Sequence, residues 1–187
     1  MIHFVSDLHI SHANIIRFSS RPYSCVEDMN EALIKNWNAA VKPDDEIWNL
    51  GDFSFASLKE IMVFLRRLNG KINMVLGNHD KPILQSQKKL IEDKLLNSVQ
   101  YYKELKINNQ LIVLSHYPFR SWNGMHRGSI HCHGHCHSNL LPFGKSVDVG
   151  VDCKEITDEY RPVSLDEVLS YMSKRSSEIV DHHGVKK

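Results

Sequence analysis

The sequence predicts a single α/β domain in which two mixed β-sheets pack face to face and are flanked by helices. In the first half of the chain, short apolar runs of strand length alternate with amphipathic segments of helical periodicity. In the second half, strand-like runs follow one another with little helix between them. This order is typical of two packed sheets with helices outside them. A chain of 187 residues suits one core, so we expect one domain over residues 1–175 and a polar C-terminal tail over residues 176–187.

The predicted strands share one pattern, in which an apolar run ends directly before polar residues. Four such runs lie at residues 2–6, 46–50, 72–76 and 111–115. Runs of this kind are typical of buried strands. Further strands are predicted at residues 101–107, 129–133 and 147–151. The Asn108-Asn109 pair predicts a hairpin turn.

The predicted helices are marked by capping signals and apolar stripes. In a Ser-x-x-Glu capping box the two side chains bind free backbone N–H groups of the first helical turn. Three such boxes are formed by Ser24 and Glu27, Ser57 and Glu60, and Ser164 and Glu167. Apolar side chains at helical spacing follow the first two boxes, at Met29, Leu33, Trp37 and Val41 and at Leu58, Ile61, Met62, Leu65 and Leu68. A further helix is predicted over residues 84–96.

The charge balance disfavours long nucleic acids as partners without excluding them, and the apolar pattern predicts no membrane partner. There are 23 Lys and Arg residues against 22 Asp and Glu residues, so no overall basic field attracts long nucleic acids. No apolar run approaches the roughly 18 residues that span a bilayer, and no basic leader precedes the first strand. We therefore expect a cytoplasmic protein without a membrane partner. Its four cysteines are expected to be reduced thiols.

The polar residues that follow the strands form a candidate metal centre. Loops beyond the carboxyl ends of parallel strands converge, so side chains placed there should meet. Imidazole, carboxylate and carboxamide groups are nitrogen and oxygen donors that suit Mn, Fe, Zn, Co or Ni. They do not form a thiolate site. Seven such groups exceed the needs of one tetrahedral ion, whereas two ions about 3.5–4 Å apart that share a carboxylate use all seven. The candidate ligands are Asp7, His9, Asp52, Asn78, His116, His135 and His137.

Five short motifs occur in the order known from one family. They are Asp7-Leu8-His9, Gly51-Asp52, Gly77-Asn78-His79-Asp80, His116 after a strand, and Gly134-His135-Cys136-His137. Together they resemble the calcineurin-like metallophosphoesterase superfamily, whose fold is a four-layer αββα sandwich. The resemblance implies that one metal is held by Asp7, His9, Asp52 and His137 and the other by Asp52, Asn78, His116 and His135.

The same resemblance implies the chemistry of the site. His79 would be the general acid, and Asp80 would orient it or raise its pKa. A hydroxide that bridges two divalent transition metals, manganese first among them, would attack the phosphorus in line. The chain lacks the Val-Asp-Arg-Gly that follows Gly-Asp in protein phosphatases, and Lys81-Pro82 replaces an Arg after Asp80. It is therefore more similar to the small phosphoesterases of bacteria and their phages.

The expected function is hydrolysis of a phosphate monoester or diester, either a nucleotide or another small phosphoester. A nuclease or a nucleic-acid end-processing phosphatase is the alternative. A non-catalytic scaffold with the same fold is less favoured, because all seven ligand candidates and His79 are present. The ligand set leaves the choice between monoester and diester, and the oligomeric state, open.

Several residues outside the ligand set are candidates for substrate contacts. Arg17 and Arg120 are substrate-binding candidates, since a guanidinium binds phosphate oxygens in pairs. His12 is a third candidate, because it could reach substrate or metal from the loop after His9, although it could equally be a helix or turn residue that contacts solvent. Arg21 and Arg127 are weaker candidates of the same kind, and each arginine could equally be a solvated surface residue. The aromatic residues Tyr117, Phe119 and Trp122 could stack on a nucleobase, although packing is the more common role. A separate structural zinc at Cys132 and Cys136 is disfavoured, because no second Cys-x-x-Cys pair is present.

Overall fold

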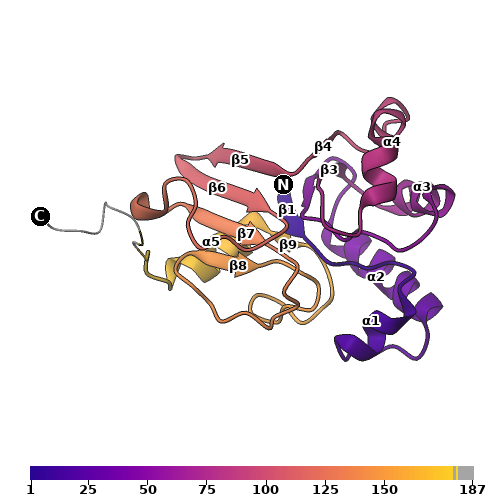
Figure 1. Ribbon diagram of the computed structural model, residues 1–187, viewed down its shortest axis with the longest axis horizontal. Coiled ribbons are helices and arrows are strands. Elements are labelled where there is room, and N and C mark those ends of the chain that lie inside the picture. The colour runs from indigo at the N-terminus through magenta and orange to yellow at the C-terminus, as the bar shows by residue number, and fades with distance from the viewer. Residues whose placement is uncertain (179, 181–187) are drawn as a thin grey trace, which may run out of the picture.

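The computed structural model describes residues 1–178 and 180 and shows two β-sheets packed face to face with helices beside them (Figure 1). The first sheet has the order β4-β3-β2-β1-β9 and the second the order β5-β6-β7-β8. The strands of the first sheet are β1 (Ile2–Val5), β2 (Glu46–Asn49), β3 (Lys71–Val75), β4 (Ser98–Gln100) and β9 (Val163–Ser164). Those of the second are β5 (Tyr102–Ile107), β6 (Gln110–Ser115), β7 (Ile130–His133) and β8 (Ser146–Asp148). The predicted fold class is confirmed.

Both sheets present the carboxyl ends of their parallel strands at a common edge. In the first sheet β1 to β4 are parallel and β9 is antiparallel to β1. In the second, β5 and β6 form an antiparallel hairpin, while β6, β7 and β8 are parallel. A parallel bridge joins Ser6, just after β1, to Gly150, just after β8. The loops that follow the strands of both sheets therefore meet at one place.

An apolar core fills the space between the sheets. Phe4, Trp48 and Val75 extend from the first sheet, and Ile112 and Cys132 from the second. Helix α5 (Leu165–Ser173) contributes side chains to the same core. The thiol of Cys132 lies within this core, so it is not available for the zinc site considered with Cys136.

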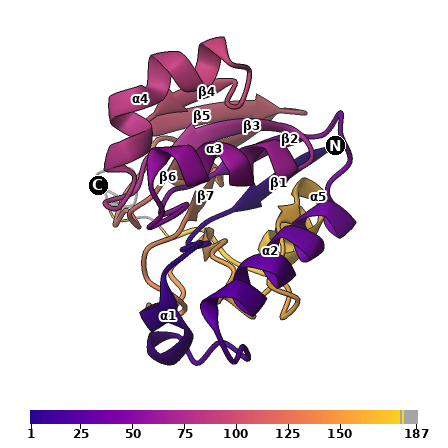
Figure 2. The same ribbon diagram turned by 90° about the vertical axis from the view of Figure 1, so that its right-hand side faces the viewer.

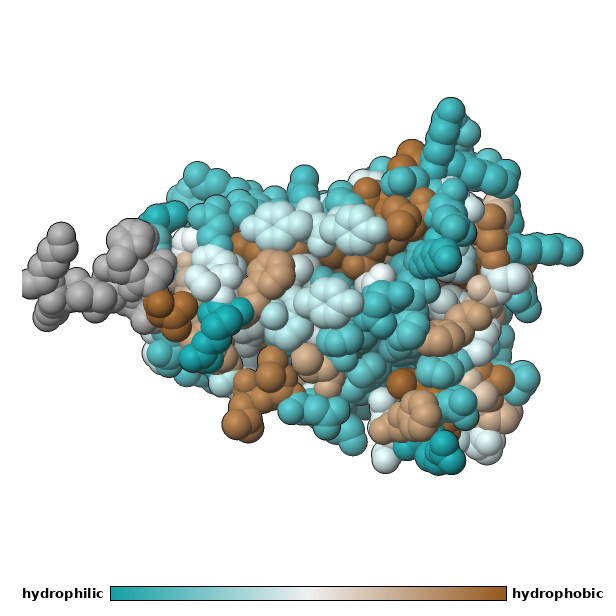
Figure 3. Space-filling model, viewed as in Figure 1, coloured by the Kyte–Doolittle hydropathy of each residue, from teal (hydrophilic) through white to brown (hydrophobic). Residues whose placement is uncertain are grey.

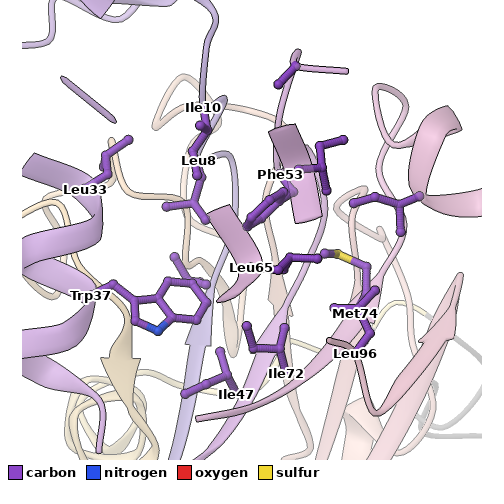
Figure 4. Packing of buried hydrophobic residues seen from close by; sticks show 14 of the residues in the cluster. Leu8, Ile10, Leu33, Trp37, Ile47, Phe53, Leu65, Ile72, Met74 and Leu96 are labelled. Carbon is purple, nitrogen blue, oxygen red and sulfur yellow. The ribbon is translucent and has the colours of Figure 1, made fainter. Parts of the chain in front are cut away.

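Three helices cover the outer face of the first sheet (Figure 2). They are α2 (Val26–Ala40), α3 (Leu58–Arg67) and α4 (Lys81–Glu92). Figure 4 shows Trp37 of α2 and Leu65 of α3 pointing toward Ile47 and Ile72 of the sheet. The fully buried indole of Trp37 donates a hydrogen bond to the carbonyl of Asn69 over 2.9 Å, which satisfies its only polar atom.

The outer face of the second sheet is covered by the segment 116–129, which contains the short 3₁₀ helix η1 (Met125–Arg127). Trp122 and Met125 pack there against Val113 of β6. The indole of Trp122 donates to the carbonyl of Ser129, and only 7% of the residue is exposed. Of the two roles considered for Trp122, packing is therefore the one observed.

Two of the three predicted capping boxes are confirmed, at Ser57 and Ser164. The third prediction is wrong, because α2 begins one residue later than expected. Cys25 is its N-cap and accepts a hydrogen bond from the backbone N–H of Asp28, while the Ser24 hydroxyl donates to the Asp28 carboxylate. The helix expected over residues 84–96 begins instead at Lys81, with Pro82 in its first turn.

Four short elements were not expected from the sequence, namely helix α1 (Ala13–Phe18), the 3₁₀ helix η1 and the strands β4 and β9. At the other end, the Arg175 guanidinium donates to the carbonyl of Gly144, which holds the chain after α5 against the second half of the fold. Of the predicted tail, residues 179 and 181–187 lie outside the described part of the chain. The four cysteines are free thiols. Within residues 1–178 and 180, none of the helices has the length and apolar character needed to cross a bilayer.

Helix α3 offers a matched test of the core. Leu65→Ala is expected to lower the free energy of unfolding by about 2–5 kcal/mol, because it opens a cavity at a side chain that is 3% exposed. Val63→Ala, at a residue of the same helix that is 49% exposed, is expected to change it by less than about 0.5 kcal/mol. Urea unfolding followed by circular dichroism measures both. Equal losses in the two variants would contradict this placement of α3.

Candidate metal centre

The predicted ligands gather at the common edge of the two sheets in two groups. Asp7, His9 and His137 form the first, and Asp52, His116 and His135 form the second, with the ligand atoms of each group within 4.8 Å of one another. Asn78 lies with the second group, because its Oδ1 is 3.0 Å from Nε2 of His116. Each group combines residues that follow strands of both sheets. The structure thus brings all seven predicted residues together.

Asp52 lies between the two groups. Its Oδ2 is 3.7 Å from Nε2 of His9 in the first group and 3.6 Å from Nε2 of His116 in the second. Its Oδ1 accepts a hydrogen bond of 2.9 Å from the backbone N–H of His79. One carboxylate oxygen is therefore fixed by the backbone while the other faces both groups, as a shared ligand requires.

Most of these residues have an unusual backbone conformation. Five of the seven have a positive φ, in the left-handed region that non-glycine residues rarely adopt: Asp7 (57°), His9 (50°), Asp52 (53°), His135 (72°) and His137 (47°). Such a conformation costs about 1–3 kcal/mol per residue and persists only where the surrounding structure holds it. Functional sites are where such strain is usually found.

Asp80 is one of the groups that hold this backbone. Its carboxylate, 1% exposed, accepts hydrogen bonds from the backbone N–H groups of Asp52 (2.8 Å), Phe53 (3.0 Å) and Gly77 (2.8 Å). Burial raises its pKa, although these three donors favour the carboxylate. No hydrogen bond joins this carboxylate to the His79 ring among the described residues, because both of its oxygens accept from the backbone. Asp80 joins the loop after β2 to the loop after β3.

The His79 side chain lies at the mouth of the site. It is 43% exposed, and its Nε2 is 4.0 Å from Oδ2 of Asp52. Its ring lies 4.5 Å from the ring of Phe55 and 5.8 Å from that of His9, measured between centroids. His79 therefore borders the ligand groups without being a member of either.

Two of the histidines are oriented by hydrogen bonds at the ring nitrogen that faces away from the site. Nδ1 of His116 lies 2.8 Å from the carbonyl oxygen of Leu50, and Nδ1 of His137 lies 2.7 Å from Oδ2 of Asp152. When Nδ1 carries the proton, Nε2 keeps a lone pair for a metal. Partners of this kind are typical of metal-binding histidines.

Asp152 is a functional residue that sequence reasoning missed. It also forms a bidentate ion pair with Arg21, in which both N···O distances are 2.8 Å. Burial disfavours the charged Asp152, but hydrogen bonds from His137 and Arg21 outweigh this effect and lower its pKa. Its position was one available signal. Asp152 directly follows the strand predicted at residues 147–151, just as several predicted ligands follow other predicted strands.

Arg21 also differs from both roles considered for it. Its side chain is fully buried, so it is neither a phosphate-binding group nor a surface residue. Besides Asp152, its guanidinium donates to the backbone carbonyls of Asp7 (2.6 Å) and Leu8 (2.8 Å). The Arg21–Asp152 pair thus connects the Asp7 loop of the first sheet to the His137 loop of the second.

Two glycines permit the close approach of these loops. A Cβ at Gly134 would lie 1.9 Å from Oγ of Ser6 and 2.4 Å from Oδ2 of Asp7. A Cβ at Gly77 would lie 2.3 Å from Oδ1 of Asp52. No side chain fits at these distances, so both positions require glycine.

The donor set suits bound cations. Oδ1 of Asp7 and Nε2 of His9 are buried and have no hydrogen-bond partner among the described residues, yet they lie only 3.8 Å apart. Burial raises the pKa of Asp7 well above its usual range and lowers the pKa of His9. Buried lone pairs without partners are costly in a protein, and a metal ion is the ligand that satisfies a carboxylate and an imidazole together. The residues present therefore fit a metal ion.

The three predicted substrate contacts are placed differently. The His12 ring stacks on Phe55 at 3.9 Å and lies 5.6 Å from the His9 ring, at the border of the site. Arg17 is exposed on α1, with its guanidinium over the ring of Phe18. The prediction for Arg120 finds no support, because its guanidinium lies 3.9 Å from the ring of Phe143, in the layer that covers the second sheet. Only His12 of the three contacts a predicted ligand.

The Arg21–Asp152 pair can be compared with an exposed bidentate pair, Arg67–Glu31. Asp152→Ala is expected to lower the free energy of unfolding by about 3–5 kcal/mol, because it leaves the charge of Arg21 buried without its partner. Glu31→Ala removes the bidentate partner of Arg67 in an exposed pair, in which the Arg67 side chain is 40% and the Glu31 side chain 63% exposed. It is expected to lower the free energy of unfolding by less than about 1 kcal/mol. Thermal unfolding of the metal-free variants measures both. If the Asp152→Ala variant were as stable as the Glu31→Ala variant, Asp152 would not hold the two loops together.

Comparison with known proteins identifies the family. The model of the calcineurin-like phosphoesterases matches residues 1–185. An uncharacterized protein of Methanocaldococcus jannaschii, MJ1445, is 35% identical over 182 residues, which cover 92% of each chain. The gene 66 protein of Mycobacterium phage L5 is 28% identical over 177 residues, or 80% of this chain and 85% of the phage protein.

A solved structure supports the fold independently. The protein AQ665 of Aquifex aeolicus, described as of unknown function, superimposes with a TM-score of 0.70 at 24% identity, over 91% of this chain and 98% of that one. The family match over nearly the whole chain agrees with the two candidate metal-binding groups at the sheet edge. The chain belongs to the calcineurin-like phosphoesterase family and is a hydrolase that acts on phosphate esters.

Proposed function

We propose that the protein hydrolyses a small phosphate ester, such as a nucleotide, at a centre of two divalent metal ions. The observation that carries the proposal is the position of Asp52, whose Oδ2 faces one group of ligands through His9 and the other through His116. Such a carboxylate is suited to be shared by two ions. The proposed metal sets are Asp7, His9, Asp52 and His137 for one ion and Asp52, Asn78, His116 and His135 for the other.

Bound metal ions would supply positive charge for the phosphate oxygens and a water-derived nucleophile at neutral pH. Manganese is the first choice, and iron, zinc, cobalt and nickel suit the same nitrogen and oxygen donors. The protein orients the donors through the contacts of His116 with Leu50 and of His137 with Asp152. It also fixes the strained loops through Asp80 and Arg21, so that little rearrangement is needed when a substrate binds.

His79 is proposed as the acid that protonates the leaving-group oxygen. Its ring is exposed at the mouth of the site, where an ester oxygen that points away from the ligand groups would lie. Its backbone N–H is bonded to Oδ1 of Asp52, so the position of the acid is tied to the shared ligand. His12 and Phe55 border the same side, with Phe55 in contact with the His79 ring.

Metal removal and replacement test the centre. Chelation is expected to abolish hydrolysis of p-nitrophenyl phosphate, bis(p-nitrophenyl) phosphate and nucleotides, and manganese is expected to restore it with two equivalents bound. Asp52→Asn is expected to reduce both the bound metal, measured by mass spectrometry, and the activity by about 100-fold or more, because the shared charge is lost. Asp158→Asn, at an exposed carboxylate, is the matched control.

Two results would contradict the centre. Asp52→Asn with two bound ions and full activity would refute the shared ligand. A reconstituted wild-type protein that hydrolyses none of these esters, and no short oligonucleotide, would refute the proposed function as a whole.

The choice of leaving group tests the acid. His79→Ala is expected to lower kcat/KM about 10²–10⁴-fold for an ester with an alkyl leaving group, which must be protonated as it departs. The loss is expected to be much smaller for a p-nitrophenyl ester, since p-nitrophenolate is stable without a proton. Metal content should be unchanged. Equal losses for both esters would show that His79 binds the substrate instead of protonating it.

A further inference from the structure

A cavity of about 340 Å³ opens beside the second ligand group. Asn78 and His116 form the part of its wall nearest the metal centre, and Leu76 and Leu84 form an apolar part. Figure 3 shows apolar side chains at the surface between β5 and α4, the region in which this cavity lies. Its volume falls within the range of pockets that bind small molecules.

Three aromatic side chains line this cavity while remaining open to solvent. Tyr101 is 64% exposed, Tyr117 48% and Phe119 36%. Large aromatic side chains that gather at one cavity without being covered are typical of ligand sites. The side chain of Lys81 adds a positive charge at the same cavity.

The cavity is connected to the metal centre through Tyr117. The Tyr117 hydroxyl donates to Oδ1 of Asn78 over 3.4 Å, and its ring lies 5.1 Å from that of His116 and 4.6 Å from that of His135. A molecule whose phosphate lies at the second ligand group would therefore reach Tyr117 directly and, through the cavity, the other two rings that line it.

The segment that carries two of these rings is held in place from below. The Ser115 hydroxyl donates to the carbonyl of Tyr117 over 2.7 Å and lies 2.9 Å from Nε2 of His131. The buried His131 ring in turn stacks on Phe119, with centroids 5.1 Å apart and ring planes 10° apart. The aromatic wall is therefore formed before a ligand arrives, which lowers the entropy that binding costs.

The cavity lies away from the proposed acid. His79 does not line it, and the His79 ring contacts Phe55 and His9 on another side of Asp52. The leaving group of an ester must lie at the acid. A group that occupies the aromatic cavity is therefore the one that stays attached to the phosphate.

We infer that this cavity binds the nucleoside of a phosphodiester, so that hydrolysis breaks the bond to the other alcohol and yields a nucleoside monophosphate. This inference rests on the proposed function and narrows its substrate class. The ring faces of Tyr101, Tyr117 and Phe119 suit a planar nucleobase, because all four bases stack on aromatic rings. In the reaction, the oxygen of water forms a bond to phosphorus, the P–O bond to the leaving alcohol breaks, and the departing oxygen takes a proton from His79. The attacking water loses a proton to solvent, and His79 regains one from solvent, so that the acid is restored.

Two substrates with the same leaving group test the inference. The p-nitrophenyl ester of thymidine monophosphate carries a nucleoside on the retained side, whereas methyl p-nitrophenyl phosphate does not. The wild-type protein is expected to prefer the thymidine ester in kcat/KM by about 10–100-fold, the range that stacking on aromatic side chains provides. Tyr101→Ala is expected to lower this preference about 10-fold.

Phe18→Ala is the matched control, because Phe18 is also 64% exposed but lies on α1, outside the cavity. The Phe18→Ala variant is expected to prefer the thymidine ester as strongly as the wild type does. Equilibrium binding of thymidine monophosphate, the expected product, gives a readout apart from turnover. Its dissociation constant is expected to rise about 10-fold in Tyr101→Ala and to stay unchanged in Phe18→Ala.

The outcomes separate the two levels of the proposal. Hydrolysis of both diesters without preference, or a preference that survives Tyr101→Ala, would overturn the nucleoside site and leave the metal-dependent hydrolase standing. Hydrolysis of p-nitrophenyl phosphate with no activity on either diester would do the same. A protein that hydrolyses none of these esters with metal bound would overturn both.

Discussion

The Asp80 carboxylate is the contact on which the geometry of the metal centre depends most. It is buried and accepts three backbone N–H bonds, from Asp52 and Phe53 after β2 and from Gly77 after β3. Asp52, Asn78 and His79, for which the roles of shared ligand, carboxamide ligand and acid are proposed, all belong to these two loops. Because an ionised carboxylate binds backbone N–H groups strongly, one side chain fixes the relative positions of three functional groups.

A second buried group does the same for the junction between the sheets. Arg21 binds backbone carbonyls of the Asp7-Leu8-His9 loop, and its partner Asp152 binds His137. The first ligand group draws on both sheets, so its geometry would change with any shift of one sheet against the other. The Arg21–Asp152 pair restrains that shift, and the bridge between Ser6 and Gly150 adds to it. Residues that never touch the substrate therefore determine the shape of the site.

The sequence predicted the two-sheet fold and the gathering of seven polar residues, because strand topology alone brings strand ends together. It did not predict the role of Asp80, since a carboxylate that binds backbone N–H groups has no partner residue type to reveal it. The position of Arg120 depends on the path of an irregular loop, which has no periodicity to read. The short elements α1, β4 and β9 span too few residues to show a period. The start of α2 was missed by one residue because Cys25 caps in place of Ser24.

The left-handed backbone of the ligand loops has a consequence for the order in which the protein matures. An unfolded chain rarely adopts such conformations, and the first ligand group joins Asp7 and His9 to His137, which is far away in the chain. Neither ligand group is complete until residues from both sheets have come together, so the centre cannot form before the loop after β7 has joined the first sheet. Metal ions that bind at this edge would therefore meet donors already held by the fold, whereas a flexible chain would select metals by their general affinity order.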